Sequence, residues 1–205
     1  MIDLEAELRT FIQTRLKSYP PDQVAVRAMA GADMARTTRE EGVRDWLNRY
    51  RVLRYVPSEV SNKVVAAIVD FADERQGGSL GQNKALIGSE FRILEGRLGV
   101  LLPLLPKSGK PRRVIPLTSK ALWCCYPNDI PIYDDYALRA LQVLTRLCHF
   151  RDPRGDTDYA RYLDAWFALY ELAKPVIESA NLNGYPFPIR VLDQFLWYLG
   201  EPSFD

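Results

Sequence analysis

Residues 112–141 read RRVIPLTSKALWCCYPNDIPIYDDYALRAL, a basic segment followed by two helix-forming stretches with a proline-containing loop between them. Thr118 and Ser119 are residue types that commonly cap helix N-termini, and the mainly apolar residues after them can form two helical turns before Pro127 ends the helix. This pattern predicts a helix over residues 118–126 with Lys120 in its first turn. A helix N-terminus already carries partial positive charge, which disfavours a lysine there. Such a lysine either points to solvent or has a functional role.

The second helix of this stretch is expected from Asp135 to Leu147, and Asp134 stands immediately before it. An aspartate in that position can accept hydrogen bonds from the free backbone N–H groups of the first turn. The neighbouring Asp135 can serve as a cap as well. The spacing therefore predicts one lysine, Lys120, and one aspartate at the N-termini of two consecutive helices, which a short loop can bring close together.

The stretch resembles the catalytic segment of the helix-hairpin-helix DNA glycosylase superfamily. In that family a hairpin leads into a helix whose first turn carries a lysine in the lyase-type members, and a Pro-Ile-x-Asp loop delivers the catalytic aspartate at the next helix start. Residues 131–134 (Pro-Ile-Tyr-Asp) with 136–141 are similar to the second half of this segment, and residues 119–120 (Ser-Lys) to the first. The match covers about thirty of the 205 residues.

This chain departs from the family pattern in two ways. The Gly-Val-Gly of the usual hairpin is absent, and residues 104–116 stand in its place. The gap from Lys120 to Asp134 is also shorter than usual by about one helical turn. If the shorter gap moves Lys120 out of reach, Asp134 can work alone with water.

The resemblance implies a fold and an activity. The fold would be all-α and helix-hairpin-helix glycosylase-like, a single domain over residues 1–205 with two helical lobes around a cleft and a lobe junction near residues 76–83. The activity would be that of a DNA N-glycosylase, with or without a lyase step. Asp134 would stabilise the positive charge that develops on the sugar, and Lys120 would attack C1′ and form a Schiff base. No metal and no organic cofactor is implied.

DNA is the partner that the resemblance implies, and the hairpin is the expected contact. A hairpin of this family contacts DNA phosphates through backbone amides and basic side chains. The alternative is that residues 107–113 form a charged loop that is exposed to solvent and has no binding role. The candidate phosphate-binding residues are Lys107, Ser108, Gly109, Lys110, Arg112 and Arg113.

Aromatic side chains crowd the same stretch. An enzyme that acts on a base must flip it out of the duplex and hold it between aromatic or apolar walls. Trp123, Tyr133 and Tyr136 are therefore candidates for a base pocket, although core packing is the commoner role of such residues. Asp193 and Trp197, four residues apart near the C-terminus, are predicted to form a buried structural pair.

Composition limits the other possibilities. The net charge is +1, the hydrophobic content is 47%, and there are three cysteines and one histidine. Cys124 and Cys125 are adjacent and Cys148 is remote, so no disulfide framework, four-cysteine iron–sulfur cluster or transition-metal site is expected. No apolar run approaches the roughly 20 residues of a membrane span, and the first residues are acidic, so a cytoplasmic protein without membrane contact is expected.

No segment alternates with a period of two over more than a few residues, whereas helical spacing recurs along the chain. The sequence therefore predicts an all-α fold. The predicted helices cover residues 3–17, 24–37, 38–55, 57–75, 84–102, 118–126, 135–147, 157–180 and 189–200.

Taken together, these features predict a DNA glycosylase that removes a modified base and leaves an abasic site. The whole chain also resembles glycosylase-like proteins from bacterial phage-defence loci, which implies a hypermodified base in phage DNA as the substrate. The alternative is a non-catalytic helix-hairpin-helix module that binds DNA or another protein, and the missing Gly-Val-Gly favours it.

Overall fold

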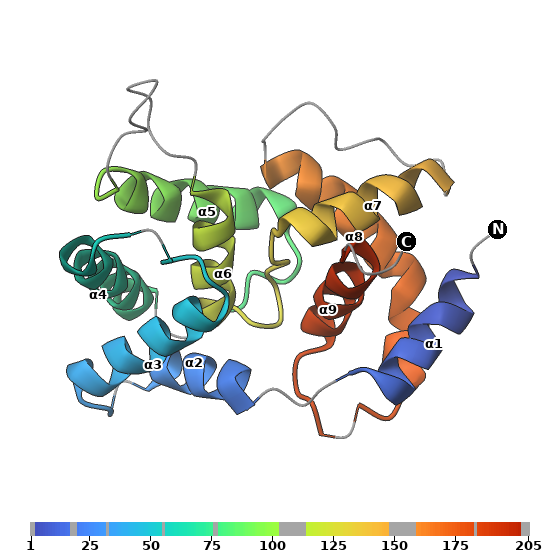
Figure 1. The fold of residues 1–205 in the computed structure, drawn as a ribbon, viewed down its shortest axis with the longest axis horizontal. Coiled ribbons are helices and arrows are strands. Elements are labelled where there is room, and N and C mark those ends of the chain that lie inside the picture. Colours follow the sequence, from blue (N-terminus) through green and yellow to red (C-terminus); the bar gives the residue numbers. More distant parts are fainter. Residues whose placement is uncertain are drawn as a thin grey trace. The chain divides into compact units, whose positions relative to one another are not determined.

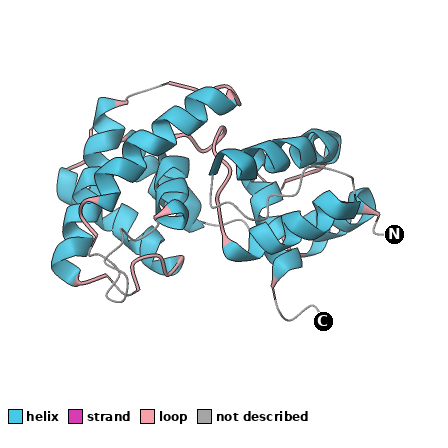
Figure 2. Ribbon diagram, turned by 90° about the horizontal axis from the view of Figure 1, so that it is seen from above, coloured by secondary structure: helices cyan, strands magenta, loops and turns pink. Residues whose placement is uncertain are grey.

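The computed structural model is all-helical over the residues it describes, and the predicted all-α class is confirmed. The described residues are 3–16, 20–31, 33–54, 56–75, 78–102, 114–147, 159–182 and 184–201. Within these ranges the chain forms nine helices and no strand (Figure 2). None of the described helices is both long and apolar enough to cross a membrane.

The chain divides into two compact units, and one of them is built from two distant parts of the sequence. Unit 1 contains residues 1–18 and 131–205, and unit 2 contains residues 19–130. The chain therefore passes from unit 2 to unit 1 between Ile130 and Pro131. The segment 76–83, where a lobe junction was expected, lies inside unit 2.

Unit 1 holds four described helices. They are α1 (Leu4–Thr14), α7 (Asp135–Leu147), α8 (Tyr159–Ser179) and α9 (Pro188–Gly200). In Figure 1 the blue α1 lies beside the orange α8, and α1 also contacts α9 although the sequence separates them widely. The apolar faces meet in a core that includes Leu8, Phe11 and Ile12 from α1 and Phe195 from α9, with the rings of Phe11 and Phe195 5.5 Å apart.

Unit 2 holds five described helices. They are α2 (Pro20–Ala30), α3 (Arg36–Arg49), α4 (Ser58–Glu74), α5 (Lys84–Gly99) and α6 (Ile115–Cys125). α6 is buried along nearly its whole length and packs against α2, α3 and α5. The side chain of Arg39 ties three helices together, because its Nε donates to the Ala28 carbonyl at 2.8 Å and its Nη2 lies 2.7 Å from an Asp73 carboxylate oxygen.

Helix starts differ from the sequence predictions at three places. α2 begins at Pro20, within the Pro-Pro pair that was expected only to end the preceding helix, because proline suits the first turn of a helix. α3 begins at Arg36, two residues before the predicted start at Thr38, so Thr38 lies inside the helix. α6 begins at Ile115 rather than near Thr118, because Pro116 fits the first turn and the buried side chains of Val114 and Ile115 extend the apolar core.

The early start of α6 leaves the Thr118 hydroxyl inside the protein. Thr118 is fully buried, and its Oγ1 has no hydrogen-bond partner. A buried hydroxyl without a partner costs free energy that a methyl group of similar shape does not.

We therefore expect Thr118→Val to raise the free energy of unfolding by about 1 kcal/mol in urea titrations. Thr118→Ser is the matched control, because it keeps the hydroxyl, loses the methyl and should lower stability by about 1 kcal/mol. A loss of stability in the valine variant would mean that the hydroxyl has a partner.

Candidate active site at the start of helix α7

Asp134 lies at the N-terminus of α7, where the sequence places it. Its Oδ1 accepts a hydrogen bond from the Tyr136 backbone N–H at 3.0 Å, and its carbonyl oxygen accepts from the Leu138 N–H at 2.8 Å. The predicted N-cap is therefore confirmed, and Asp135 is the first residue of the helix. Asp134 is half-buried, so its carboxylate is oriented by the helix end without being enclosed.

Two of the three aromatic candidates lie beside Asp134 in unit 1. The Tyr133 ring meets the Tyr162 ring edge-on, with centroids 5.0 Å apart. The Tyr136 ring meets Trp197 edge-on at 5.7 Å, and the guanidinium carbon of Arg139 lies 5.6 Å from the centre of the same Tyr136 ring. Both tyrosines are half-buried.

Trp123 has a different place. It is fully buried in unit 2 and stacks on Trp46 with ring centroids 5.4 Å apart and planes 9° from parallel. This is the core packing that was weighed as the alternative to a base pocket.

The predicted pairing of Asp193 with Trp197 is wrong. Asp193 is buried, but its Oδ1 accepts a hydrogen bond from Trp166 Nε1 on α8 at 2.9 Å. Trp197 is 42% exposed and packs against Tyr136. The spacing of four residues puts both side chains on one side of α9, but it cannot tell which neighbouring helix supplies the partner.

Two tyrosines that the sequence did not single out contact the loop before Asp134. The Tyr159 hydroxyl donates to the Pro131 carbonyl at 2.6 Å, and the Tyr162 hydroxyl donates to the Ile132 carbonyl at 2.7 Å. Burial, together with the nearby Asp193 carboxylate, raises the pKa of both phenols well above the ordinary value, so both remain protonated donors. The sequence signal for them is weak: Tyr159, Tyr162 and Trp166 follow helical spacing, as core residues commonly do.

Lys120 lies in unit 2, in the second turn of α6, and not in a first turn as expected. The residue is 1% exposed, and its Nζ lies 6.0 Å from the centre of the Tyr50 ring. The Tyr50 hydroxyl in turn donates to Asp22 at 3.0 Å, and Trp46 Nε1 donates to the same carboxylate oxygen at 2.9 Å. Lys120 thus belongs to a buried polar and aromatic cluster of unit 2, whereas Asp134, Tyr133 and Tyr136 belong to unit 1.

The proposed phosphate-binding residues Lys107, Ser108, Gly109, Lys110, Arg112 and Arg113 lie outside the described residues. The helices on either side of this connection, α5 and α6, pack against each other within unit 2.

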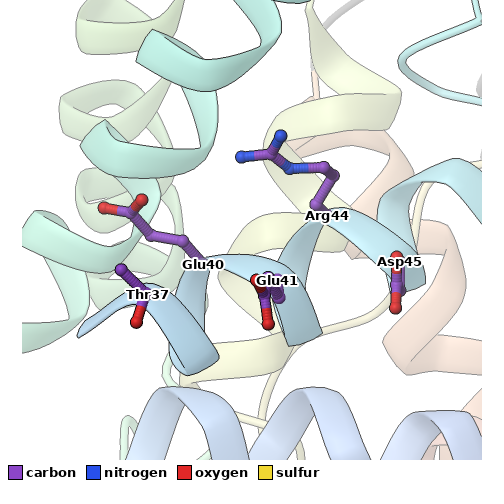
Figure 3. A pocket seen from close by; sticks show the side chains of 5 residues that line it. All are labelled: Thr37, Glu40, Glu41, Arg44 and Asp45. Atoms are coloured by element: carbon purple, nitrogen blue, oxygen red, sulfur yellow. The ribbon is translucent and has the colours of Figure 1, made fainter. Parts of the chain in front are cut away.

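A shallow hollow lies on the surface of unit 2 and contains none of the predicted site residues. It is lined from α3 by Thr37, Glu40, Glu41, Arg44 and Asp45. Figure 3 shows that the side chains of Glu40 and Arg44 point to one side of the helix, while those of Glu41 and Asp45 point to the other. Because these described lining residues all come from one helix and their side chains diverge, they form no convergent set of groups for catalysis.

Within the described ranges, neither the Cys125 thiol nor a metal-binding cluster forms a rival site. Burial raises the pKa of the Cys125 thiol to about 12, so this thiol stays protonated at neutral pH and is a poor nucleophile. Within the described ranges, no group of three or more histidine, cysteine, aspartate or glutamate side chains is arranged to hold a metal ion.

Comparison with known proteins gives no match: no family model, curated protein or solved structure is significantly similar to this chain.

The end of α9 approaches the first turn of α7 so closely that only glycine fits. A Cβ on Gly200 would lie 1.9 Å from the Tyr136 carbonyl oxygen and 2.6 Å from its carbonyl carbon. We expect Gly200→Ala to lower the free energy of unfolding by about 2 kcal/mol and to displace the turn whose N–H holds Asp134. Urea unfolding and hydrogen exchange of the Tyr136 amide measure the two effects.

Gly96→Ala is the control for this prediction. Gly96 lies in α5, and a Cβ there would have no atom within 4 Å outside its own helix turn. Alanine should therefore raise stability by about 0.5–1 kcal/mol through its higher helix propensity. Equal effects of the two substitutions would show that the contact between Gly200 and Tyr136 imposes no constraint.

Proposed function

We propose that this protein is a DNA glycosylase of the helix-hairpin-helix type, which removes a modified base and leaves an abasic site. The observation that carries the proposal is the Asp134 carboxylate at the end of a Pro-Ile-Tyr-Asp loop, oriented at the start of α7 by the Tyr136 N–H. The order of elements supports it too, because two packed helices, α5 and α6, precede the loop that ends in Asp134.

The proposed chemistry needs one carboxylate and one water molecule. When the bond between C1′ and the base nitrogen breaks, the electron pair leaves with the base and positive charge develops on the sugar. A carboxylate already held in place stabilises that charge without reorganising. The water oxygen then bonds to C1′, and its released proton balances the charge of the departing base. Asp134 would supply the carboxylate, and its half-buried position leaves room for a substrate sugar to approach.

In this proposal Asp134 is the main catalytic residue, and the hydrolytic reaction does not require Lys120. A lyase-type reaction requires its amine to reach C1′, whereas the residue is 1% exposed and its ammonium faces the ring of Tyr50. The burial favours the hydrolytic route, in which Asp134 works with water.

Borohydride trapping on substrate DNA separates the two routes, because only a Schiff base is trapped. A trapped complex that disappears in Lys120→Ala would restore the lysine to the mechanism.

The proposed substrate is a hypermodified base in phage DNA. Tyr133 and Tyr136, both half-buried, flank Asp134 in the sequence, and aromatic rings suit stacking against a flipped base. The net charge of +1 is low for an enzyme that must scan a genome, and the hairpin sequence departs from the family pattern. Both features favour a restricted substrate over general lesion repair.

Purified protein incubated with modified phage DNA should generate abasic sites and should spare the unmodified counterpart. Equal release from both DNAs, or release only from uracil or oxoguanine, would contradict the substrate assignment.

The second candidate function is a non-catalytic module that binds DNA or another protein on the same scaffold. The burial of Lys120 and the absence of Gly-Val-Gly favour it. It predicts DNA or protein binding with no base release from any substrate in the panel.

Asp134→Asn is the direct test of the carboxylate. Asparagine is also a good N-cap, so the free energy of unfolding should change by less than about 1 kcal/mol. The rate of base release should fall by about 100-fold or more, because the amide carries no charge to stabilise the sugar cation. Asp135→Asn, at the exposed first position of α7, is the matched control and should stay within about twofold of the wild type. Base release by Asp134→Asn at the wild-type rate would show that Asp134 serves only as a helix cap.

Arg112 and Arg113 should set DNA affinity and not base choice. Cations that contact phosphates release counterions, so the double alanine variant should bind all sequences more weakly and with a flatter dependence of log K on log salt, by about 1 unit of slope for each lost contact. Fluorescence titrations at several salt concentrations measure this. Arg49→Ala with Arg51→Ala, two basic residues far from the hairpin in the sequence, is the control. An unchanged slope in the Arg112 and Arg113 variant would remove the hairpin from the interface.

A further inference from the structure

The carboxylate of Asp193 is buried in unit 1, and both of its oxygens are used. Oδ2 accepts a hydrogen bond from the Ile132 backbone N–H at 3.1 Å, and Oδ1 accepts from Trp166 Nε1 at 2.9 Å. Nη1 of Arg190 lies 3.8 Å from Oδ2. Asp193 is 1% exposed, so this charge lies almost entirely out of water. Replacing a buried ion by an apolar residue is often neutral or stabilising, so stability alone is a poor reason for a carboxylate here.

The contacts of Asp193 lead to the loop that carries Asp134. Pro131 has no N–H, so the backbone polar groups of Pro131 and Ile132 are the Pro131 carbonyl, the Ile132 N–H and the Ile132 carbonyl. Tyr159 holds the first, Asp193 the second and Tyr162 the third. Side chains from α8 and α9 thus satisfy every backbone polar group of these two residues. Pro131 and Ile132 lie outside any helix, and the path of the chain there depends on these three side chains.

Two residues separate this anchored loop from the carboxylate. Tyr133 packs edge-on against Tyr162, and Asp134 is then held at the start of α7 by the Tyr136 N–H. The chain from Pro131 to Asp134 is therefore held at successive residues, first by side chains of α8 and α9 and then by the end of α7. A catalytic group gains its effect from being held in place before the substrate arrives, and a misplacement of about 1 Å can cost about 100-fold in rate.

We infer that Asp193 is a positioning residue for Asp134, acting through the Ile132 amide with the help of the Tyr159 and Tyr162 hydroxyls. The inference rests on the proposed function, because it assigns Asp193 to the placement of the proposed catalytic carboxylate. It concerns only residues of unit 1. Asp193 does not touch the substrate in this role.

The kinetic test uses the full-length protein and single-turnover base release from modified phage DNA. Asp193→Asn keeps an acceptor for one N–H group and turns an amide N–H towards the other, so the loop should shift. The release rate at saturating enzyme should fall by about 10- to 100-fold while the concentration dependence changes by no more than about twofold. Tyr162→Phe removes only the hydroxyl that holds the Ile132 carbonyl, and it should show the same pattern with a smaller loss. If Asp193→Asn does not fold, Tyr162→Phe carries this test.

Tyr170→Phe is the matched control. Tyr170 lies on α8 with Tyr162, is buried and stacks on Trp166, whereas the loop carbonyls accept their hydrogen bonds from Tyr159 and Tyr162. Its removal should leave the release rate within about twofold of the wild type. An unchanged rate in the folded Asp193→Asn or Tyr162→Phe variant would overturn the inference. A loss equal to that of Tyr170→Phe, or one that follows the folded fraction alone, would overturn it too.

A second readout separates this inference from the proposed function. Carbon-detected NMR of the Asp134 carboxyl and hydrogen exchange of the Ile132 amide need no substrate. In Trp166→Phe, which removes the N–H group that Asp193 Oδ1 accepts from, both signals should change relative to Tyr170→Phe. If wild-type protein releases no base from any DNA, the proposed function fails, yet these signals still decide whether Asp193 sets the environment of Asp134. Unchanged signals at Asp134 and Ile132 would overturn the positioning role even in an active enzyme.

Discussion

The hydrogen bond from the Ile132 N–H to the buried Asp193 carboxylate is the interaction on which the candidate site depends. Pro131 and Ile132 are buried in the loop before Asp134, and leaving their backbone polar groups without hydrogen-bond partners would cost about 1–3 kcal/mol each. Asp193, Tyr159 and Tyr162 remove that cost, and in doing so they specify the path of the chain. The packing of Gly200 against the Tyr136 carbonyl then sets how closely α9 can approach α7.

Unit 2 also uses a buried aspartate to hold a segment that lies outside its helices. Asp129 is buried and accepts hydrogen bonds from the Ser79 hydroxyl and the Leu80 N–H, which holds the loop before α5 to the end of the loop after α6. Asp22 differs, because it lies within α2 and accepts from the side chains of Trp46 and Tyr50. Helices satisfy their own backbone groups, so an all-helical protein needs buried acceptors mainly where its helices stop. Buried aspartates fill that need in both units.

Most of the helices could be predicted from periodicity, and Asp134 could be predicted as a cap because the rule for N-caps is local. Lys120 was misplaced for a local reason as well: Pro116 allows α6 to begin earlier than the cap-forming Thr118 suggests, which carries the lysine into the second turn and the core. The partner of Asp193 could not be predicted. Trp166 and Ile132 reach Asp193 from 27 and 61 residues away, and spacing along one helix says nothing about contacts at such separations. For the same reason the sequence predicted aromatic neighbours for Asp134 but not the tyrosine hydroxyls that hold its loop.

The division of the chain has a consequence for synthesis on the ribosome. Unit 2 is one continuous segment, whereas unit 1 joins residues 1–18 to residues 131–205. Chains emerge from the N-terminus at about 5–20 residues per second, and domains generally fold as units. Unit 2 can therefore fold while α1 still waits for α8 and α9. About 60 residues separate Asp134 from Asp193, so the carboxylate emerges roughly 3–12 seconds before the residue that anchors its loop. A nascent chain thus carries Asp134 without its Asp193 anchor until α9 has been made.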